Sequence, residues 1–413
     1  MSSVAAAKIV SQRTYPVGGK LNITEHFFDV PKDHSKPEGG TIRVFARSVK
    51  KRDTAIVPDS SKDKEQLPWM CYLQGGPGLP CRAPQHYNFT QTILDRGYQL
   101  LYLDQRGTGL STPLTASTLG MRGNTDVQAR HLKLHRADSI VKDCEAIRQA
   151  LTADWPEEKK KWSIIGQSFG NEAYFAKFPE DVARVKTIMN YLSRFGDGKI
   201  KLPSEGTLTR RRFRQIGINL GFHGGLDMVH DIVLRAACDV ESFGHLTRGT
   251  LSTIDQATAF DEHLIYAILH EPLYCEGNAP NWSAHRLMSE YSVFDLEKAG
   301  DEPIYFTGEM IYPWMFEDYS ELRKVQDTAN RIALDSDWPA LWDEQQLARN
   351  EVPVYAASYV EDMYVDFDLG METARKVKGC KVFTTNVMFH DGMRSKMDEV
   401  FKQAFALRDD VVD

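Results

Sequence analysis

The sequence predicts an α/β protein with a mostly parallel sheet and an inserted, mostly helical domain. Short apolar runs at 70–74, 98–104 and 162–166 each lead into a glycine-containing turn. Runs of this kind are typical of buried parallel strands with loops at their carboxyl ends. A helical pattern at 138–153 separates the second run from the third. Alternation of strands and helices favours a sheet that is covered on both faces.

The individual elements follow from hydrophobic periodicity. Residues 41–49 alternate between apolar and polar side chains, which predicts a half-buried strand. In 138–153, Asp138 is a plausible helix N-cap. The apolar residues after it share one face at helical spacing, and they are Ile140, Val141, Cys144, Ile147 and Leu151.

The hydrophobic pattern of the sequence changes after about residue 180. Patterns typical of helices dominate 180–345, with glycine- or proline-containing interruptions at 221–225 and 280–283. Strand and helix patterns then return in the order 352–359, 369–378, 380–388 and 394–407. We therefore expect the first part of a core at 1–178, a helical cap domain at 179–345 and the rest of the core at 346–413.

Composition excludes several classes of protein. Of the 413 residues, 42% are hydrophobic and 26% are charged, and the net charge of −7 disfavours nucleic acid and anionic membranes as partners. The basic run at 209–214 is expected to be a solvated helix face. Lys8 interrupts the N-terminus before an apolar signal segment forms, and no run approaches the ~18 apolar residues of a membrane span. A cytoplasmic protein is expected, and its oligomeric state stays open.

The sequence shows no metal or cofactor motif. The six cysteines lack metal-ligand spacing, and reduced thiols are expected. His270 and Glu271 begin like a zinc-protease motif, but Tyr274 occupies the position of the second histidine. We therefore expect neither a metal nor a cofactor.

The strongest chemical motif is Gly166-Gln167-Ser168-Phe169-Gly170, which matches G-x-S-x-G and directly follows a predicted strand. In this motif a sharp strand-to-helix turn raises the serine hydroxyl above the sheet, and glycine fits the crowded flanking positions. Ser168 is therefore the candidate nucleophile.

A second motif, Gln74-Gly75-Gly76-Pro77-Gly78, also follows a predicted strand. In folds with this nucleophile turn, such a loop supplies one backbone N–H of the oxyanion hole, and the residue after the nucleophile supplies the other. Gly76 and Phe169 are the candidate donors. Each such donor can contribute roughly 3–4 kcal/mol to stabilising the oxyanion.

Two further residues complete a catalytic triad. Asp362 follows the predicted strand 352–359, and His390 follows the predicted strand 380–388. Catalytic groups gather beyond the carboxyl ends of strands in open α/β sheets. The histidine would accept the proton of Ser168, and the aspartate would orient the imidazole ring. Three nearby carboxylates compete with Asp362 for that role, namely Glu361, Asp366 and Asp391.

The motifs in the order Ser, Asp, His indicate an α/β-hydrolase core with an inserted helical cap. The chain resembles the proline iminopeptidases (prolyl aminopeptidases), in the larger branch found in fungi and bacteria. The resemblance implies metal-free release of an N-terminal proline from a peptide through an acyl-enzyme intermediate. The segments that carry it are 73–80, 103–111, 162–170, 269–277, 282–286, 306–316 and 358–367.

The cap segments contain candidate substrate-binding residues. A free N-terminal amine is a cation, so buried carboxylates would bind it and reject internal peptide bonds. Glu271 and Glu309 are the candidates for this role. Tyr274, Trp314 and Phe316 are candidate walls of an apolar slot for the proline ring. For each of these residues a purely structural role in the cap is the alternative. Asp104 and Arg106 are expected to clamp a loop and not to catalyse.

One departure from the family pattern follows the nucleophile. Asn171 stands where relatives have glycine, and the chain passes almost directly to 174–189, which resembles cap sequence. By this comparison about fifty residues are absent. Residues 185–192 would then either replace a lost core strand or leave the sheet incomplete. An impaired aminopeptidase is therefore expected, with another α/β-hydrolase esterase or amidase, or an inactive truncated isoform or scaffold, as alternatives.

Overall fold

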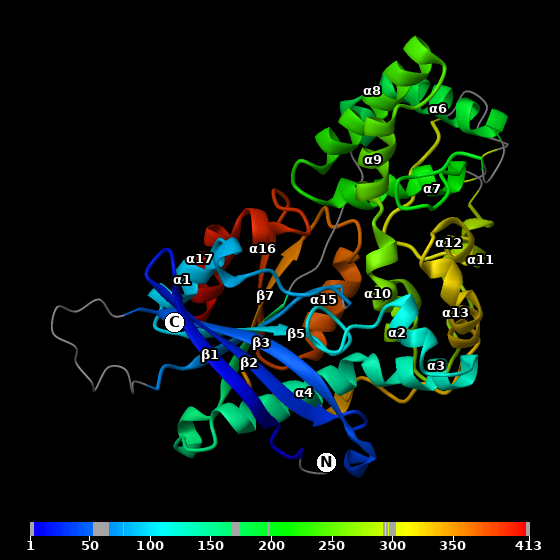
Figure 1. The fold of residues 1–413 in the computed structure, drawn as a ribbon. Coiled ribbons are helices and arrows are strands. Elements are labelled where there is room, and N and C mark those ends of the chain that lie inside the picture. The colour runs from blue at the N-terminus through cyan, green and yellow to red at the C-terminus, as the bar shows by residue number, and fades with distance from the viewer. Residues whose placement is uncertain are drawn as a thin grey trace. The chain divides into compact units, whose positions relative to one another are not determined.

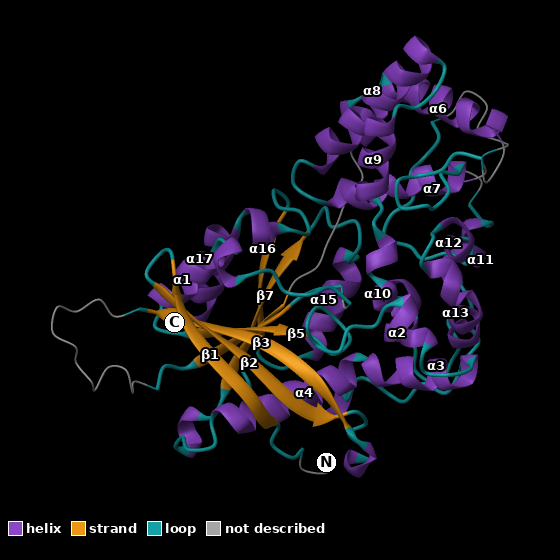
Figure 2. Ribbon diagram, viewed as in Figure 1, coloured by secondary structure: helices purple, strands orange, loops and turns teal. Residues whose placement is uncertain are grey.

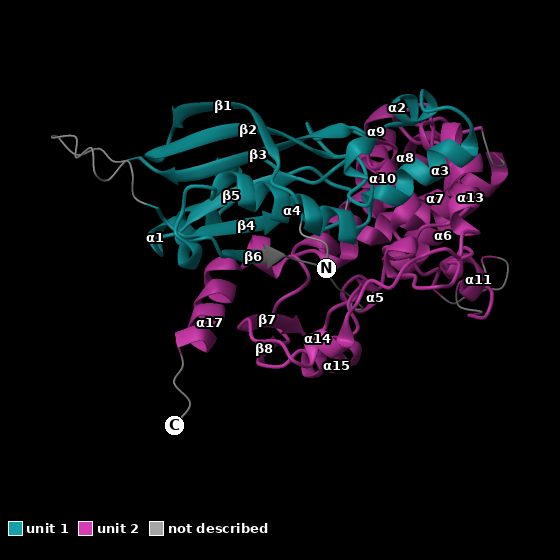
Figure 3. Ribbon diagram, turned by 90° about the horizontal axis from the view of Figure 1, so that it is seen from below, with its two compact units in different colours: residues 1–167 teal, residues 168–413 magenta. Residues whose placement is uncertain are grey.

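The computed structural model describes residues 4–52, 66–76, 78–166, 174–195, 199–291, 294, 296 and 303–409. Contacts along the chain divide it into two compact units, Met1–Gln167 and Ser168–Asp413, which Figure 3 shows in different colours. The three-part division into 1–178, 179–345 and 346–413 stays a prediction.

The first unit contains a six-stranded mixed sheet in the order β1-β2-β3-β5-β4-β6, all six of which are labelled in Figure 3. Figure 1 labels four of these strands, β1, β2, β3 and β5. The first three strands and β5 are antiparallel neighbours, whereas β4 is parallel to both β5 and β6. The strands are β1 Lys8–Val17, β2 Leu21–Pro31, β3 Thr41–Lys51, β4 Trp69–Leu73, β5 Gln99–Asp104 and β6 Trp162–Gly166. The helices are α1 Phe89–Asp95, α2 Ala116–Gly120, α3 Thr125–Leu132 and α4 Ala137–Leu151. Parallel strands alternate with helices here, so the predicted α/β class is confirmed.

Burial on both faces explains why β4 and β5 are apolar without alternation. Cys71 and Tyr72 of β4 are consecutive residues that point to opposite faces, and both are buried. Helix α4 covers one face, where its Ala146 and Ile147 pack in a core with Phe28 and other strand residues. Val141 does not share this apolar face, so its predicted place there is wrong, because 62% of Val141 is exposed.

The turn after β5 is held by a buried ion pair. Both ends of the Arg106 guanidinium donate to Asp143 of α4, from Nε to Oδ2 at 2.6 Å and from Nη2 to Oδ1 at 2.5 Å. The remaining Arg106 N–H groups donate to the backbone carbonyls of Pro31, Lys32 and Leu134. Asp104 accepts from two backbone N–H groups, those of Cys81 and Leu110. This geometry agrees with the expected loop clamp.

The second unit is mainly helical up to residue 345, as Figure 2 shows in purple. Strands β7 Val354–Tyr359 and β8 Cys380–Thr385 form a parallel two-stranded sheet. The helices before β7 are α5 Tyr174–Lys177, α6 Asp181–Phe195, α7 Arg210–Arg214, α8 Gly225–Phe243, α9 Arg248–Ala257, α10 Leu264–Leu269, α11 Ser283–Met288, α12 Met315–Asp318, α13 Gln326–Ala333 and α14 Glu344–Leu347. Those after β7 are α15 Phe367–Lys376, α16 Gly392–Ser395 and α17 Met397–Asp409.

Residues 185–192 do not replace a core strand, because they lie inside α6. The apolar residues of this segment recur at helical spacing and form one stripe. That stripe is buried against α8, whose Val229, Ile232 and Val233 belong to the same core. The buried stripe consists of Val185, Ile188, Met189 and Leu192. Burial of this face outweighs the suitability of the apolar run for a strand.

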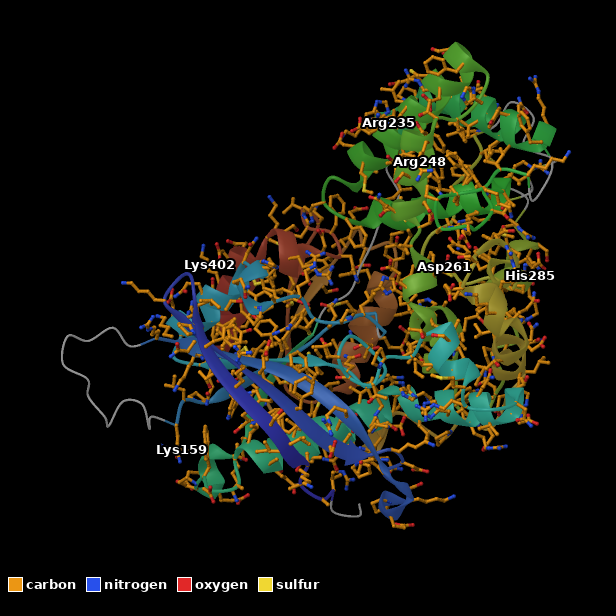
Figure 4. All side chains as sticks on the ribbon, viewed as in Figure 1. Lys159, Arg235, Arg248, Asp261, His285 and Lys402 are labelled. Carbon is orange, nitrogen blue, oxygen red and sulfur yellow. The ribbon has the colours of Figure 1, made fainter. Side chains whose placement is uncertain are left out.

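The basic run at 209–214 is also not a solvated helix face. Arg212 and Arg214 are buried, and Arg212 forms an ion pair with Asp255 at 3.1 Å. Arg214 donates to backbone carbonyl groups. Buried arginine requires such partners, so these cations hold the unit together. By contrast, Arg235 and Arg248 are exposed (Figure 4).

Carboxylates also organise the turns of this unit. Asp261, which is labelled in Figure 4, accepts hydrogen bonds from the backbone N–H groups of Glu321 and Leu322.

Among the helices that the structure describes, none combines the length and the apolar character needed to span a membrane.

Replacing Arg106 by alanine should destabilise the first unit by about 3–5 kcal/mol, because it leaves the Asp143 carboxylate buried without its main partner. Denaturant unfolding followed by tryptophan fluorescence measures the loss. Arg43→Ala is the matched control, since Arg43 pairs with Asp29 at 2.7 Å with 45% of its side chain exposed. That substitution should cost less than about 1 kcal/mol. Equal losses in the two variants would contradict the assignment of the Arg106 clamp.

Candidate active site

The parallel pairing of β7 with β8 brings two predicted catalytic residues together. Their register ends at Tyr359 opposite Thr385, so the loops that follow leave the same edge of the sheet. Asp362 lies in the first loop and His390 in the second. His390 Nδ1 is 3.5 Å from Asp362 Oδ2, and both side chains are buried.

The loop backbone fixes the Asp362 carboxylate. The N–H groups of Tyr364 and Val365 donate to Oδ1 at 3.1 and 2.8 Å, whereas Oδ2 faces His390. Burial raises the pKa of Asp362 to about 7, and the two backbone hydrogen bonds oppose that rise. The carboxylate is therefore held in one orientation toward the imidazole.

The environment of His390 favours a neutral imidazole. Burial lowers the pKa of His390 to about 2, and the nearby Arg394 cation acts in the same direction. The ring of Tyr364 meets the His390 ring edge-on, with centroids 6.0 Å apart. The imidazole is therefore free to accept a proton, but the low pKa makes it a weak base, so a general-base role requires Asp362 to stabilise the imidazolium.

The structure distinguishes Asp362 from the three competing carboxylates. Glu361 is exposed. Asp366 caps α15 by accepting from the Leu369 N–H at 2.9 Å. Asp391 accepts from the backbone N–H of His223 at 3.0 Å. Only Asp362, among these four, has its carboxylate against the ring of His390.

Glu309 is a half-buried carboxylate that lies near this pair. Its Oε1 accepts a hydrogen bond from the Tyr266 hydroxyl. Burial raises the pKa of Glu309 to about 7, the Tyr266 hydrogen bond lowers it and the nearby Asp362 raises it further. A Cβ added at Gly308 would lie 3.3 Å from the ring of Tyr364, so the Glu309 segment packs directly on the Asp362 loop.

The other candidate carboxylate, Glu271, is engaged by the backbone. It accepts from the N–H groups of Ser283 and Ala284, at 3.0 and 2.9 Å, at the start of α11. Burial raises the pKa of Glu271, and these two hydrogen bonds oppose the rise. Glu271 therefore organises the cap chain, and an amine-binding role for it stays a prediction.

The three candidate slot residues differ in their surroundings. Tyr274 is exposed and lies close enough to Glu309 for the two to interact electrostatically. Trp314 is buried and stacks on Tyr312, with ring centroids 5.4 Å apart. Phe316 is fully buried and contacts the Trp282 ring. The contacts of Trp314 and Phe316 are those of core aromatics, and the role of Tyr274 as a slot wall stays a prediction.

The remaining candidates are Ser168, Phe169 and Gly76. Ser168 and Phe169 lie outside the described residues. Gly76 belongs to the first unit and has a φ of +131°, and a Cβ there would lie 3.2 Å from Leu79 Cγ. That conformation requires glycine. The pairing of Gly76 with Phe169 as oxyanion donors stays a prediction from the sequence.

Two residues at the site, Tyr266 and Tyr364, were not predicted from the sequence. Tyr266 lies in the apolar helix α10, where a tyrosine resembles ordinary core. Tyr364 donates its hydroxyl to the Ile218 carbonyl at 2.6 Å and shares the loop of Asp362. Its sequence segment carried part of the family resemblance, but nothing in the pattern assigned it a contact. Within the described residues, no group of three or more His, Cys, Asp or Glu side chains has the arrangement of a metal site.

Two curated proteins are similar to this chain over nearly their whole lengths. One is named proline iminopeptidase aneH, from Aspergillus aculeatus, and is 41% identical over 456 residues, covering 100% of this chain and 99% of the relative. The other is a proline iminopeptidase from Aeromonas sobria, 33% identical over 436 residues, covering 94% and 97%. The chain belongs to the proline iminopeptidase family. The α/β-hydrolase fold implied by the resemblance follows from this membership.

Other comparisons add little to the proline iminopeptidase assignment. No family model matches the chain. A solved proline iminopeptidase from Mycobacterium smegmatis is 10% identical, with a TM-score of 0.32 over 97% of this chain and 98% of that chain. The alignment with the Aspergillus protein spans 456 residues, whereas this chain has 413, so that proline iminopeptidase has residues that this chain lacks.

Replacing Tyr266 by phenylalanine should raise the pKa of Glu309 above about 7, because it removes a hydrogen bond to the ionised carboxylate. A rise of about one unit is expected, since hydrogen bonds to charged groups contribute ~1.5–3 kcal/mol. The titration of Glu309 is followed by NMR of ¹³C-labelled glutamate and assigned with Glu309→Gln. Tyr312→Phe, another buried tyrosine of this unit, should leave the titration unchanged. A lowered or constant pKa in Tyr266→Phe would refute the interaction.

Proposed function

We propose that this chain is a serine aminopeptidase that releases N-terminal proline, or a similar residue, from peptides. The observation that carries the proposal is the placement of the half-buried Glu309 next to the buried Asp362–His390 pair. This cluster combines a general base with a carboxylate for a cationic amine. The two relatives named proline iminopeptidase support the same activity.

In the proposed reaction, His390 accepts the hydroxyl proton of Ser168 as the oxygen attacks the carbonyl carbon of the first residue. The N–H groups of Gly76 and Phe169 stabilise the resulting oxyanion. His390 then protonates the departing nitrogen, which leaves the first residue as an ester on Ser168. Water, deprotonated by His390, then attacks the ester carbonyl; the bond to Ser168 Oγ breaks, His390 returns the proton to that oxygen, and the free amino acid is released. Asp362 orients the ring and stabilises the imidazolium.

Glu309 gives this chemistry its selectivity for a free N-terminus. A buried carboxylate gains most by pairing with a cation, and an internal peptide nitrogen carries no charge. An N-acylated substrate would cover the half-buried Glu309 without supplying a cation. The cost of that mismatch disfavours internal peptide bonds. Tyr274 lies near Glu309 and is the proposed wall for the proline ring.

We further propose that the shortened segment after Ser168 weakens the reaction. The longer alignment with the Aspergillus relative supports a loss of residues from this chain. A displacement of about 1 Å at a catalytic group can cost about 100-fold in rate. The chain would then keep the chemistry of the family at a reduced turnover. We also propose a cytoplasmic location and peptides as the natural substrates.

Hydrolysis of a proline arylamide should require a free amine and Glu309. Glu309→Gln should raise KM for the free-amine substrate about 10- to 100-fold, because a charge-assisted hydrogen bond is lost. Between pH 6 and 8, kcat/KM for the arylamide relative to a neutral ester should rise, because Glu309 becomes ionised as the pH passes its pKa of about 7. Glu309→Gln should abolish that rise. The measurement is steady-state kinetics across this pH range.

Glu317→Gln is the matched control, since 55% of the Glu317 side chain is exposed and the residue pairs with Arg211. It should leave both KM and the pH profile unchanged. Equal rates on the arylamide and its N-acetylated form would refute amine recognition. Hydrolysis of the ester alone would favour the alternative of a general esterase.

A further inference from the structure

A second histidine contacts the turn that carries His390. His223 lies in the glycine-containing segment just before α8, far from His390 in the sequence. Its backbone N–H donates to Asp391 Oδ1 at 3.0 Å, and its Nδ1 contacts the same carboxylate oxygen. His223 therefore binds Asp391, the residue after His390, through both its backbone and its side chain.

The ring of His223 also touches the other neighbour of His390. The Phe389 ring lies against it nearly edge-on, with centroids 5.1 Å apart. Ser395 Oγ is 2.7 Å from His223 Nδ1 and also donates to the Asp391 carbonyl at 3.0 Å. The Asp391 carboxylate can only accept, and the Ser395 hydroxyl proton is donated to the Asp391 carbonyl. The Nδ1–H of His223 is therefore the donor toward both Asp391 and Ser395. The residues on both sides of His390 are thus fixed by one imidazole.

The same turn also packs against the end of β7. A Cβ added at Gly392 would lie 2.8 Å from the Tyr359 hydroxyl. The contact between His223 and Asp391 is a second attachment of the turn, and both side chains are partly buried, with 19% of His223 and 14% of Asp391 exposed. Partly buried contacts of this kind are screened less by water than exposed ones.

We propose that His223 is a positioning residue, which holds the turn Phe389-His390-Asp391 so that His390 stays against Asp362. This inference rests on the proposed role of His390 as the general base. It assigns a function to the interruption at 221–225 that the catalytic proposal leaves unexplained. It also makes the turnover of the enzyme depend on a segment of the predicted cap region that contributes no reacting atom.

His230 offers a closely matched control within α8. Its Nδ1 is 2.8 Å from Asp181 Oδ2, its side chain is also 19% exposed, and the ring of Phe178 stacks on it at 4.0 Å. The two histidines therefore share residue type, exposure, an aspartate partner and an aromatic neighbour. His230 has no contact with the His390 turn among its hydrogen bonds and ring contacts in the described part of the chain.

The first measurement is amide hydrogen exchange of the full chain, read by mass spectrometry over residues 386–396. His223→Ala should accelerate exchange there by at least about 10-fold, whereas His230→Ala should leave that segment as in the parent. His223→Asn keeps a donor near the position of Nδ1 and should restore most of the protection. Equal exchange in His223→Ala and His230→Ala would overturn the proposal, whatever the activity of the chain.

Kinetics supply the second readout. His223→Ala should lower kcat for the proline arylamide about 10- to 100-fold with KM changed less than about 2-fold, since a displacement of ~1 Å has an effect of this size. His223→Asn should recover most of kcat, and His230→Ala should change neither constant. A parent chain without activity would refute the proposed function, while the exchange data would still decide the role of His223. An active parent with unchanged kcat in His223→Ala would overturn the positioning role.

Discussion

Asp362 and His390 meet because β7 and β8 pair in parallel and end at one edge of their sheet. Each residue lies in a loop only a few positions beyond its strand, so the strand register limits where its side chain can reach. Backbone N–H groups then hold one oxygen of Asp362 and leave the other toward the imidazole. The chemistry that we propose depends on this contact, because only an oriented neutral imidazole can accept the serine proton.

Burial of charge has opposite consequences in the two units. Asp143 is buried, and each of its carboxylate oxygens accepts a hydrogen bond from Arg106, so its charge is already balanced by a cation. Glu309 is half-buried with a tyrosine hydroxyl and another carboxylate nearby, and desolvation raises its pKa to about 7. A carboxylate in such surroundings gains stability when a cation arrives. The contrast separates a residue that maintains the fold from one that is suited to a ligand.

Sequence reasoning located strands β3 to β8 and the Asp362–His390 pair, because strand ends and local motifs depend on short-range patterns, but it gave no range for β1 or β2. It failed where tertiary contacts decide the outcome. The apolar run 185–192 forms a helix because α8 offers a core for its apolar stripe. Arg212 is buried because Asp255, distant in sequence, receives it. No local pattern reveals that the Tyr266 hydroxyl reaches Glu309, or that the backbone at the start of α11 engages Glu271.

The central claim is that the Asp362–His390 pair activates Ser168 toward the carbonyl of an N-terminal residue. The most direct measurement is rapid acid quenching of the chain with a proline ester, followed by mass spectrometry of the peptide that contains Ser168. We predict a prolyl adduct on Ser168 that is absent from Ser168→Ala and strongly reduced in His390→Ala. Product release without an adduct, or an adduct on another residue, would contradict the account.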